Sequence, residues 1–383
     1  MQFLNNISLF FFVLATTTQM YAGFLGAYGL NVILYLIYFI GLISYFILNF
    51  KKLKLFFLDF LIIAFSVIYV STIIYTINGD FKTKLLLLII LPFYYFNGKI
   101  MILKGDYDKF SFYFILIVLF SDIYIFYQLL RNNLIYHIYY WYSDAILKVD
   151  YLTMSMFSFV ALVLLISKSI IRVKIIKILL ILFFSFMILV SGARFSILFL
   201  LVVSLIYFFY KIKNKKMFLY TNLFILFIIG YGYLNQHNIE KNFSYTIERL
   251  NSMFGNDNSI QTRDVLIEQS LGYINESPIF GYGINSSENL LILKYPHNMF
   301  LETWLESGIL NTLILFIIIL NILYMAWRLF KSNIDKYNFA IVLYLILSYL
   351  KSFTIAEGKL LFLYFGIICA EFLEYKKKDK NED

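Results

Sequence analysis

Apolar stretches long enough to cross a lipid bilayer recur along almost the whole chain. A membrane helix needs roughly 20 mostly apolar residues, and such runs follow one another from the first residues almost to the last. The chain has 383 residues, of which 61% are hydrophobic and only 14% are charged, as in membrane proteins. The spans are therefore the fold itself, and we predict an all-α, polytopic membrane helix bundle.

The apolar runs predict about twelve transmembrane helices. They lie near 5–22, 28–48, 55–77, 85–102, 110–130, 151–168, 175–191, 194–210, 217–234, 304–327, 338–352 and 359–374. The first run lacks a basic start and a clear cleavage site, so we interpret it as a span and not as a signal peptide. This divides the chain into a nine-span bundle (1–234), a long extracytoplasmic loop (235–297) and a three-span segment with a cytoplasmic tail (298–383).

Basic turns alternate along the chain with turns that carry little positive charge. Most of the 32 lysines and arginines lie in one set of short turns: 51–54, 104–109, 167–177, 211–216, 328–336 and the C-terminal tail. The positive-inside rule places this set and both termini in the cytoplasm, and the remaining turns outside it. Orientation thus explains the net charge of +9, and no nucleic-acid partner is expected.

The sequence offers no metal cage and no disulfide framework. Its one cysteine, Cys369, lies in the last apolar run, and the histidines His137, His237 and His297 are far apart. We expect no metal site and no cofactor. Lone histidines are usually packing or surface residues, which is the interpretation we prefer for His137 and His237.

The loop 235–297 is the one long stretch that is not lipid-like, and long loops in compact proteins are usually functional. Its segment TRDVLIEQSLGYI predicts a short amphipathic helix with Thr262 as N-cap. The apolar face of this helix is expected to consist of Val265, Leu266, Leu271 and Ile274.

The segment SPIFGYG follows that helix and predicts a turn. Pro278 opens it, and Gly281 and Gly283 allow positive φ or a close approach of backbone to another group.

Three charged side chains are candidates for function because a charge at the membrane is costly. Arg194 follows the short Ser-Gly-Ala turn between two spans and must lie at the outer rim, where it binds a phosphate or only reaches lipid headgroups. Arg263, beside Asp264, is a ligand contact or an ordinary solvated charge. Asp122, within a span, pairs with a rim arginine or makes a hydrogen bond between helices.

Polar residues also precede the span 304–327. His297 and Asn298 could belong to a site or simply cap the helix. Glu302 and Glu306 are four residues apart and share one helix face. Because two carboxylates facing lipid would be costly, we expect them to face the bundle interior, paired with arginines or with ligand hydroxyls.

The order of these motifs resembles the O-antigen ligase and polymerase family of bacterial membrane enzymes. The family pattern is an arginine opening a helix, a Pro-x-x-Gly-x-Gly turn, and His-Asn-x-x-Leu-Glu followed by a glycine at the start of a span. Here these elements are Arg263, the turn 278–283, the segment from His297 to Glu302, and Gly308. The sequence SGAR at 191–194 is similar to an earlier arginine motif of the family.

The resemblance implies glycosyl transfer without a metal ion at the outer face of the bacterial inner membrane. The donor is a glycan on undecaprenyl diphosphate, and the acceptor is a glycan or lipid A-core. Arg194 and Arg263 then stabilise the departing diphosphate, and His297 is the general base or a diphosphate ligand. Asn298, Glu302, Glu306, Gly281 and Gly283 line or shape the substrate site.

Members of the family differ in the acceptor. A polymerase extends the chain on the next lipid-linked repeat unit, whereas a ligase passes the finished glycan to lipid A-core. The compact chain, rich in Ile, Phe, Tyr, Lys and Asn, favours a surface-polysaccharide polymerase, for which a chain-length regulator is a possible partner besides membrane lipids. A flippase for the same lipid-linked units is less favoured, because no internal repeat is evident.

Overall fold

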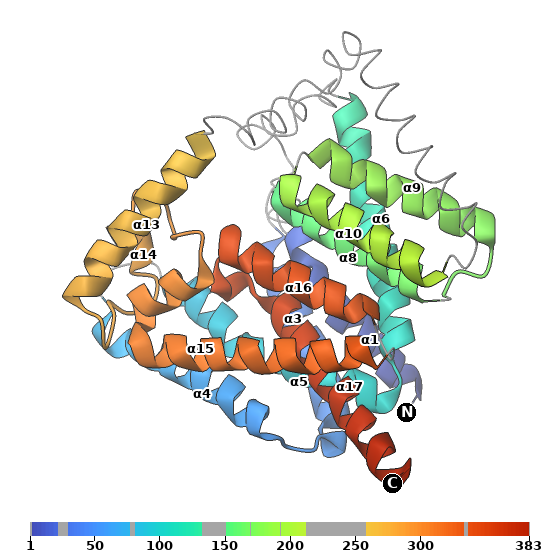
Figure 1. Ribbon diagram of the computed structural model, residues 1–383, viewed down its shortest axis with the longest axis horizontal. Helices are drawn as coiled ribbons and strands as arrows, with labels where there is room; N and C mark the ends of the chain where they lie inside the picture. Colours follow the sequence, from blue (N-terminus) through green and yellow to red (C-terminus); the bar gives the residue numbers. More distant parts are fainter. Residues whose placement is uncertain are drawn as a thin grey trace. The chain divides into compact units, whose positions relative to one another are not determined.

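The computed structural model describes residues 2–21, 30–76, 81–131, 151–168, 170–191, 193–211, 258–332 and 336–382 (Figure 1). Within these ranges every regular element is a helix, which confirms the prediction of an all-α fold. The predicted span 217–234 and the histidines His137 and His237 lie outside the described residues.

Each of the other predicted spans coincides with an α-helix. These helices are α1 (Gln2–Thr17), α3 (Asn31–Asn49), α4 (Phe57–Ser71), α5 (Phe81–Lys104), α6 (Tyr107–Arg131), α8 (Tyr151–Ser167), α9 (Lys174–Ser191), α10 (Arg194–Lys211), α15 (Met299–Lys331), α16 (Lys336–Lys351) and α17 (Lys359–Glu382). The loop region 258–298 adds α13 (Asn258–Glu276) and the one-turn α14 (Ser287–Leu290). Short 3₁₀ segments include η3 (Thr72–Tyr75) and η5 (Ile355–Glu357).

In the described part of the chain, six helical segments are both long enough and apolar enough to cross a membrane. They are Gln2–Met20, Phe57–Tyr75, Phe81–Lys104, Tyr107–Gln128, Lys174–Ser191 and Met299–Lys331. Three further apolar helices are shorter. The protein is therefore a multi-span membrane protein, and the total of about twelve spans stays a prediction.

The chain forms two compact units. The first unit contains Met1–Phe12, Tyr38–Phe110 and Asp257–Asp383, and the second contains Val13–Ile37 and Ser111–Asn256. The first unit therefore joins segments from both ends of the sequence.

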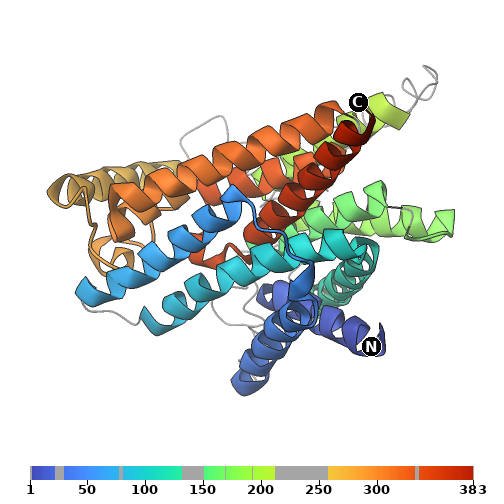
Figure 2. The same ribbon diagram turned by 90° about the horizontal axis from the view of Figure 1, so that it is seen from below.

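Helices α5 and α17 of the first unit pack closely because glycines lie where they cross, and Figure 2 shows the two helices side by side. A Cβ added to Gly366 of α17 would lie 1.9 Å from the carbonyl oxygen of Tyr95, and one added to Gly98 of α5 would lie 2.3 Å from that of Leu363. Small residues let membrane helices approach until their backbones touch. This close pair forms the centre of the first unit.

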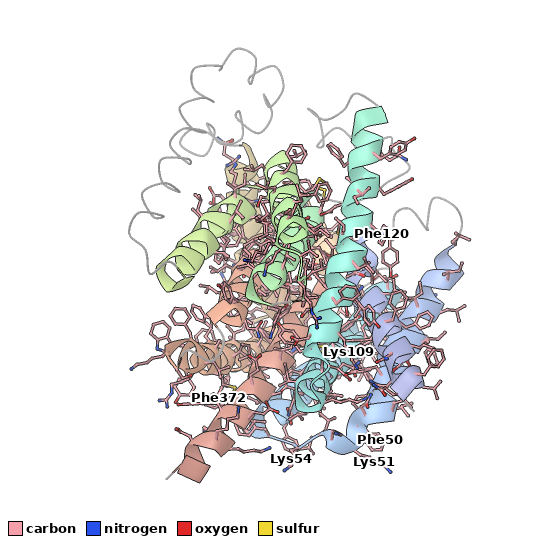
Figure 3. All side chains as sticks on the ribbon, turned by 90° about the vertical axis from the view of Figure 1, so that its right-hand side faces the viewer. Phe50, Lys51, Lys54, Lys109, Phe120 and Phe372 are labelled. Atoms are coloured by element: carbon pink, nitrogen blue, oxygen red, sulfur yellow. The ribbon has the colours of Figure 1, made fainter. Side chains whose placement is uncertain are left out.

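The basic turns of the first unit lie at one of its ends. Lys99 of α5, fully buried, contacts both oxygens of Asp59 at 2.7 Å and donates to the carbonyl of Lys54 at 3.1 Å. The hydroxyl of Tyr107 donates to Asn338 at 2.6 Å, which joins the start of α6 to the start of α16. Figure 3 labels Lys51 and Lys54 at this end. The turns predicted to be cytoplasmic are thus brought together in this unit.

The second unit is built around α8, whose residues from Thr153 to Leu165 are all buried. A helix that is covered on all sides is apolar all round, which explains the absence of an amphipathic pattern in this span. Asp122 of α6 is fully buried and accepts a hydrogen bond from Ser158 of α8 at 2.7 Å. Of the two alternatives for Asp122, the structure shows the hydrogen bond between helices.

Candidate functional site

The amphipathic helix predicted in the loop is present as α13, but it begins at Asn258. The prediction of Thr262 as its N-cap is therefore wrong. Leu266 and Ile274 are buried as expected, whereas Val265 and Leu271 are 42% and 43% exposed. Adjacent helical residues point about 100° apart, so the buried face follows the four-residue spacing from Leu266 to Ile274 and leaves Val265 and Leu271 outside it.

A kink in α15 receives the predicted turn. Gly308 has φ 78° and ψ 178°, so the helix is interrupted there and its last carbonyls before the kink lack helical partners. The turn supplies those partners: the N–H groups of Tyr282 and Gly283 donate to the carbonyls of Leu305 and Glu306 at 2.8 and 2.9 Å. In return, the N–H of Ile309 donates to the carbonyl of Pro278 at 3.1 Å. The turn and the kink are thus one structural unit.

This contact explains two of the glycines in the motif. A Cβ on Gly308 would lie 1.9 Å from the carbonyl oxygen of Ile279, and one on Gly281 would lie 2.7 Å from that of Leu305. Both residues also have positive φ, which disfavours any other amino acid. Gly283 is a third residue with positive φ in the same contact region. The spacing of glycines seen in the sequence is therefore required by backbone contact.

Two carboxylates on the first part of α15 share one buried lysine. Nζ of Lys84 lies 2.6 Å from Glu302 and 2.7 Å from Glu306, and both glutamates are fully buried. The two glutamates face the interior, as expected. Their charged partner among the described residues is a lysine, whereas the prediction named arginines or ligand hydroxyls. Because burial strengthens a charge interaction and makes an unpaired charge costly, the three side chains form one unit, the Lys84–Glu302–Glu306 triad.

Glu302 also holds the segment between α16 and α17. It accepts hydrogen bonds from the hydroxyl of Thr354 and, at 2.9 Å, from the N–H of Ile355. Both of its oxygens are therefore bound by protein groups. The segment 352–355 is fixed to α15 at this point.

Glu306 holds the segment that follows the glycine turn. It accepts from the N–H of Asn285 at 3.0 Å, the hydroxyl of Ser287 at 2.5 Å and the hydroxyl of Tyr69 at 3.0 Å. Through Lys84 and Tyr69 the two glutamates also reach α5 and α4. The triad thus joins five separate parts of the sequence at one end of the first unit: α4, α5, residues 285–287, α15 and residues 354–355.

His297 lies against the segment that Glu302 fixes. Its Nδ1 is 3.1 Å from the carbonyl oxygen of Ser352. A carbonyl only accepts, so Nδ1 carries the proton and Nε2 is left with its lone pair. The ring also lies 4.5 Å from that of Tyr295, and the backbone has a positive φ of 54°, an uncommon conformation for histidine.

The surroundings of His297 keep it neutral. Partial burial lowers the pKa of the imidazole below its usual value, and the positive charge of Arg263 lowers it further. The hydrogen bond to Ser352 acts in the opposite direction but does not outweigh burial. Arg263 of α13 is thus close enough to act electrostatically on His297, and a neutral imidazole with a free Nε2 is suited to accept a proton.

Asn298 is the N-cap of α15, which is one of the two roles that the sequence predicted for it. Its side-chain oxygen accepts from the N–H groups of Phe300 and Leu301 at 2.9 and 3.2 Å. The cap fixes the direction in which the chain leaves His297 and enters the helix.

Replacing Asn298 with alanine is expected to lower the free energy of unfolding by about 1 kcal/mol, because two N–H groups at the helix start lose their acceptor. Asn298→Ser keeps an acceptor and should lose much less. Thermal unfolding of the detergent-solubilised protein compares the three forms. An equal loss in both variants would mean that capping is not what Asn298 contributes.

Residues 178–316 match the family model described as O-antigen ligase. This match supports the O-antigen ligase and polymerase family that the order of the motifs indicates. The matched segment contains most of α9, all of α10, α13 and α14, and the first part of α15. It therefore includes Arg194 and the motif from Arg263 to Gly308. Among curated proteins, none matches the chain.

Arg194, within the O-antigen ligase match, is the first residue of α10. It lies in the second unit, whereas the other predicted site residues belong to the first. The turn before it is closed by a hydrogen bond of 3.2 Å from the N–H of Ala193 to the hydroxyl of Ser191. The arginine is half-buried at the start of its helix.

Lys84 and Tyr69 are residues of the site that the sequence did not reveal, and Lys84 carries the charge. Lys84 lies in the first turn of α5, directly before the apolar run of that helix and 218 positions before Glu302. One signal was present: Lys84 is the last residue of the turn 78–84, which belongs to the set predicted to lie outside the cytoplasm, where lysines are less frequent. A lysine there suggests a buried carboxylate partner. In the described part of the chain, no three His, Cys, Asp or Glu side chains are grouped as metal ligands.

Proposed function

We propose that this family member is a surface-polysaccharide polymerase. It joins repeat units carried on undecaprenyl diphosphate by glycosyl transfer at the outer face of the bacterial inner membrane. The observation that carries the proposal is the O-antigen ligase match over residues 178–316, which includes the residues gathered around the α15 kink. The preference for a polymerase follows from the compact, Ile- and Phe-rich composition.

The arrangement of the first unit supports an outer location of the site. The kinked part of α15 contacts Lys84 and the segment 352–355, both from turns predicted to lie outside the cytoplasm. The basic turns lie together around Lys54 and Asn338, away from these contacts. In the proposed orientation both termini are cytoplasmic.

The proposed reaction is a single displacement at the anomeric carbon of the donor glycan. A hydroxyl of the acceptor glycan forms the new glycosidic bond, the bond to the diphosphate oxygen breaks, and undecaprenyl diphosphate leaves. Nε2 of His297 accepts the hydroxyl proton. Arg263, which acts electrostatically on His297, stabilises the negative charge on the departing diphosphate, because a guanidinium stays charged and binds two oxygens at once. The same role for Arg194, which belongs to the second unit, stays a prediction.

Glu302 and Glu306 position the site in this proposal. Their oxygens are bound by Lys84 and by backbone and hydroxyl groups, so they hold the walls of the site in place. Glu302 fixes the segment whose Ser352 carbonyl orients His297. Gly281 and Gly283 allow the turn to meet α15.

A reconstitution experiment distinguishes the polymerase from two other activities, those of a ligase and of a flippase. The purified protein is placed in liposomes with a lipid-linked repeat unit and no nucleotide or ion gradient. Chain extension supports the polymerase, and transfer only to added lipid A-core supports the ligase, the activity that the matched family model describes. Translocation without bond formation would contradict both and indicate a flippase. In cells, loss of the gene should leave single repeats on the core if the protein is a polymerase.

The pH dependence of chain extension tests the role of His297. The neutral imidazole is the base, so activity should be full above its pKa and fall as pH decreases through it. Because burial and Arg263 lower that pKa, the midpoint of this acid limb should lie below the ordinary value of 6.5. His297→Gln should lose roughly 10²- to 10⁴-fold in kcat and lose the limb. A variant that keeps the same acid limb would exclude His297 as the base.

A further inference from the structure

Two large apolar side chains project from the glycine turn into solvent. Ile279 is 61% exposed and Phe280 is 69% exposed, although both lie in the motif that contacts the α15 kink. Large exposed apolar groups at a rigid position usually mark an interaction surface.

The backbone that carries these side chains is held from three directions. The carbonyl of Phe280 accepts from the hydroxyl of Tyr75 at 2.8 Å, and that of Pro278 accepts from Nε1 of Trp304 at 2.9 Å. The carbonyl of Ile279 lies against Gly308. With the backbone fixed in this way, Ile279 and Phe280 are held outward and cannot fold back onto the protein.

The turn is hydrogen-bonded to two membrane spans that carry exposed apolar side chains next to the points of attachment. Next to Tyr75, at the end of the span Phe57–Tyr75, Ile74 is 86% exposed. Just beyond the kink in the span Met299–Lys331, Leu310 and Leu313 are 59% and 50% exposed. These side chains are exposed among the described residues of the first unit, and hydrocarbon is the surrounding expected for apolar residues on a membrane span.

We infer that Ile279 and Phe280 form a wedge that enters the membrane at the outer ends of α4 and α15, with lipid hydrocarbon as its partner. Attachment to two spans that carry exposed apolar side chains favours lipid over a second protein. Tyr75 and Trp304, which hold the wedge, are the residue types that prefer the boundary between hydrocarbon and headgroups.

The wedge fixes the depth of the turn in the bilayer. Through the turn it also fixes the depth of the kink, the Lys84–Glu302–Glu306 triad and His297. If the proposed function holds, this depth is that of the headgroup layer, where the diphosphate of a lipid-linked donor lies.

The experiment measures the membrane depth of position 280 and requires no glycan substrate. Cys369 is buried and is the chain's one cysteine, so Phe280→Cys gives a single accessible site for a fluorescent thiol label. The protein is reconstituted in liposomes that contain lipids brominated on their acyl chains. Leu313→Cys serves as the lipid-facing control, and Glu268→Cys, exposed on α13, as the aqueous control. The unaltered protein gives the background labelling of Cys369.

The label at position 280 should be quenched by brominated lipid as strongly as the label at 313, and should be shielded from iodide in water. The label at 268 should show the reverse. Quenching at 280 that matches 268 would overturn the inference, and so would shielding from both quenchers, which would indicate a protein partner. Because the readout is independent of activity, loss of the proposed glycosyl transfer would leave this result intact.

Discussion

Lys84→Met should destabilise the protein by about 3–5 kcal/mol, the usual cost of leaving a buried charge without its partner. Lys84 neutralises part of the charge of Glu302 and Glu306, which are both fully buried and which bind it at 2.6 and 2.7 Å. Without the lysine, two carboxylates would lie close together in a fully buried site. Thermal unfolding in detergent and the folded fraction on size-exclusion chromatography measure the loss.

Two controls separate this effect from a simple change in helix α5. Lys82→Met lies two residues earlier on an exposed face and should change stability by no more than about 0.5 kcal/mol. In a background that carries Glu302→Gln and Glu306→Gln, the cost of Lys84→Met should be much smaller, because no charge is left unpaired. An equal cost in both backgrounds would show that the ion triad does not hold this part of the protein together.

The triad also connects stability with the proposed chemistry. Lys84 holds Glu302, Glu302 holds Thr354 and Ile355, and the same segment presents the Ser352 carbonyl to His297. A variant of Lys84 that still folds should therefore lose activity through the position of His297, without touching the substrate.

The helices were predictable from the sequence because spanning a membrane is a local requirement. A run such as 304–327 must be a helix whatever its neighbours are, since backbone groups in hydrocarbon need partners within the same segment. The kink at Gly308 was not predictable in this way. Its carbonyls find partners in residues 282 and 283, so the interruption depends on a turn that precedes the helix in the sequence.

The site was predictable only where its motif is continuous in the sequence. His297, Asn298 and the two glutamates follow one another within 10 positions, and the spacing of Glu302 and Glu306 placed them on one face. Lys84 and Tyr69 contact the same carboxylates from 218 and 237 positions away, a pairing that no local pattern encodes. Half of the predicted buried face of α13 was wrong for a related reason. The packing of α15 against α13, and not the sequence of α13 itself, decides which of its apolar residues are covered.

Gly308→Ala should be among the most damaging single-methyl changes in the chain. The added Cβ would lie 1.9 Å from the carbonyl oxygen of Ile279, and φ 78° with ψ 178° is a conformation that essentially only glycine adopts. Backbone strain and the clash together should cost about 2–6 kcal/mol and separate the turn from α15.

Gly272→Ala is the matched control. Gly272 lies on the exposed side of α13, and an added Cβ would meet no atom within 4 Å. There the same methyl group should stabilise the helix by about 0.4–1 kcal/mol, since alanine loses less chain entropy on folding than glycine. Thermal unfolding measures both variants. A lower unfolding temperature for Gly308→Ala and a higher one for Gly272→Ala would establish that the turn and the kink hold each other. A Gly308→Ala protein as stable as the parent would contradict the contact on which the site is built.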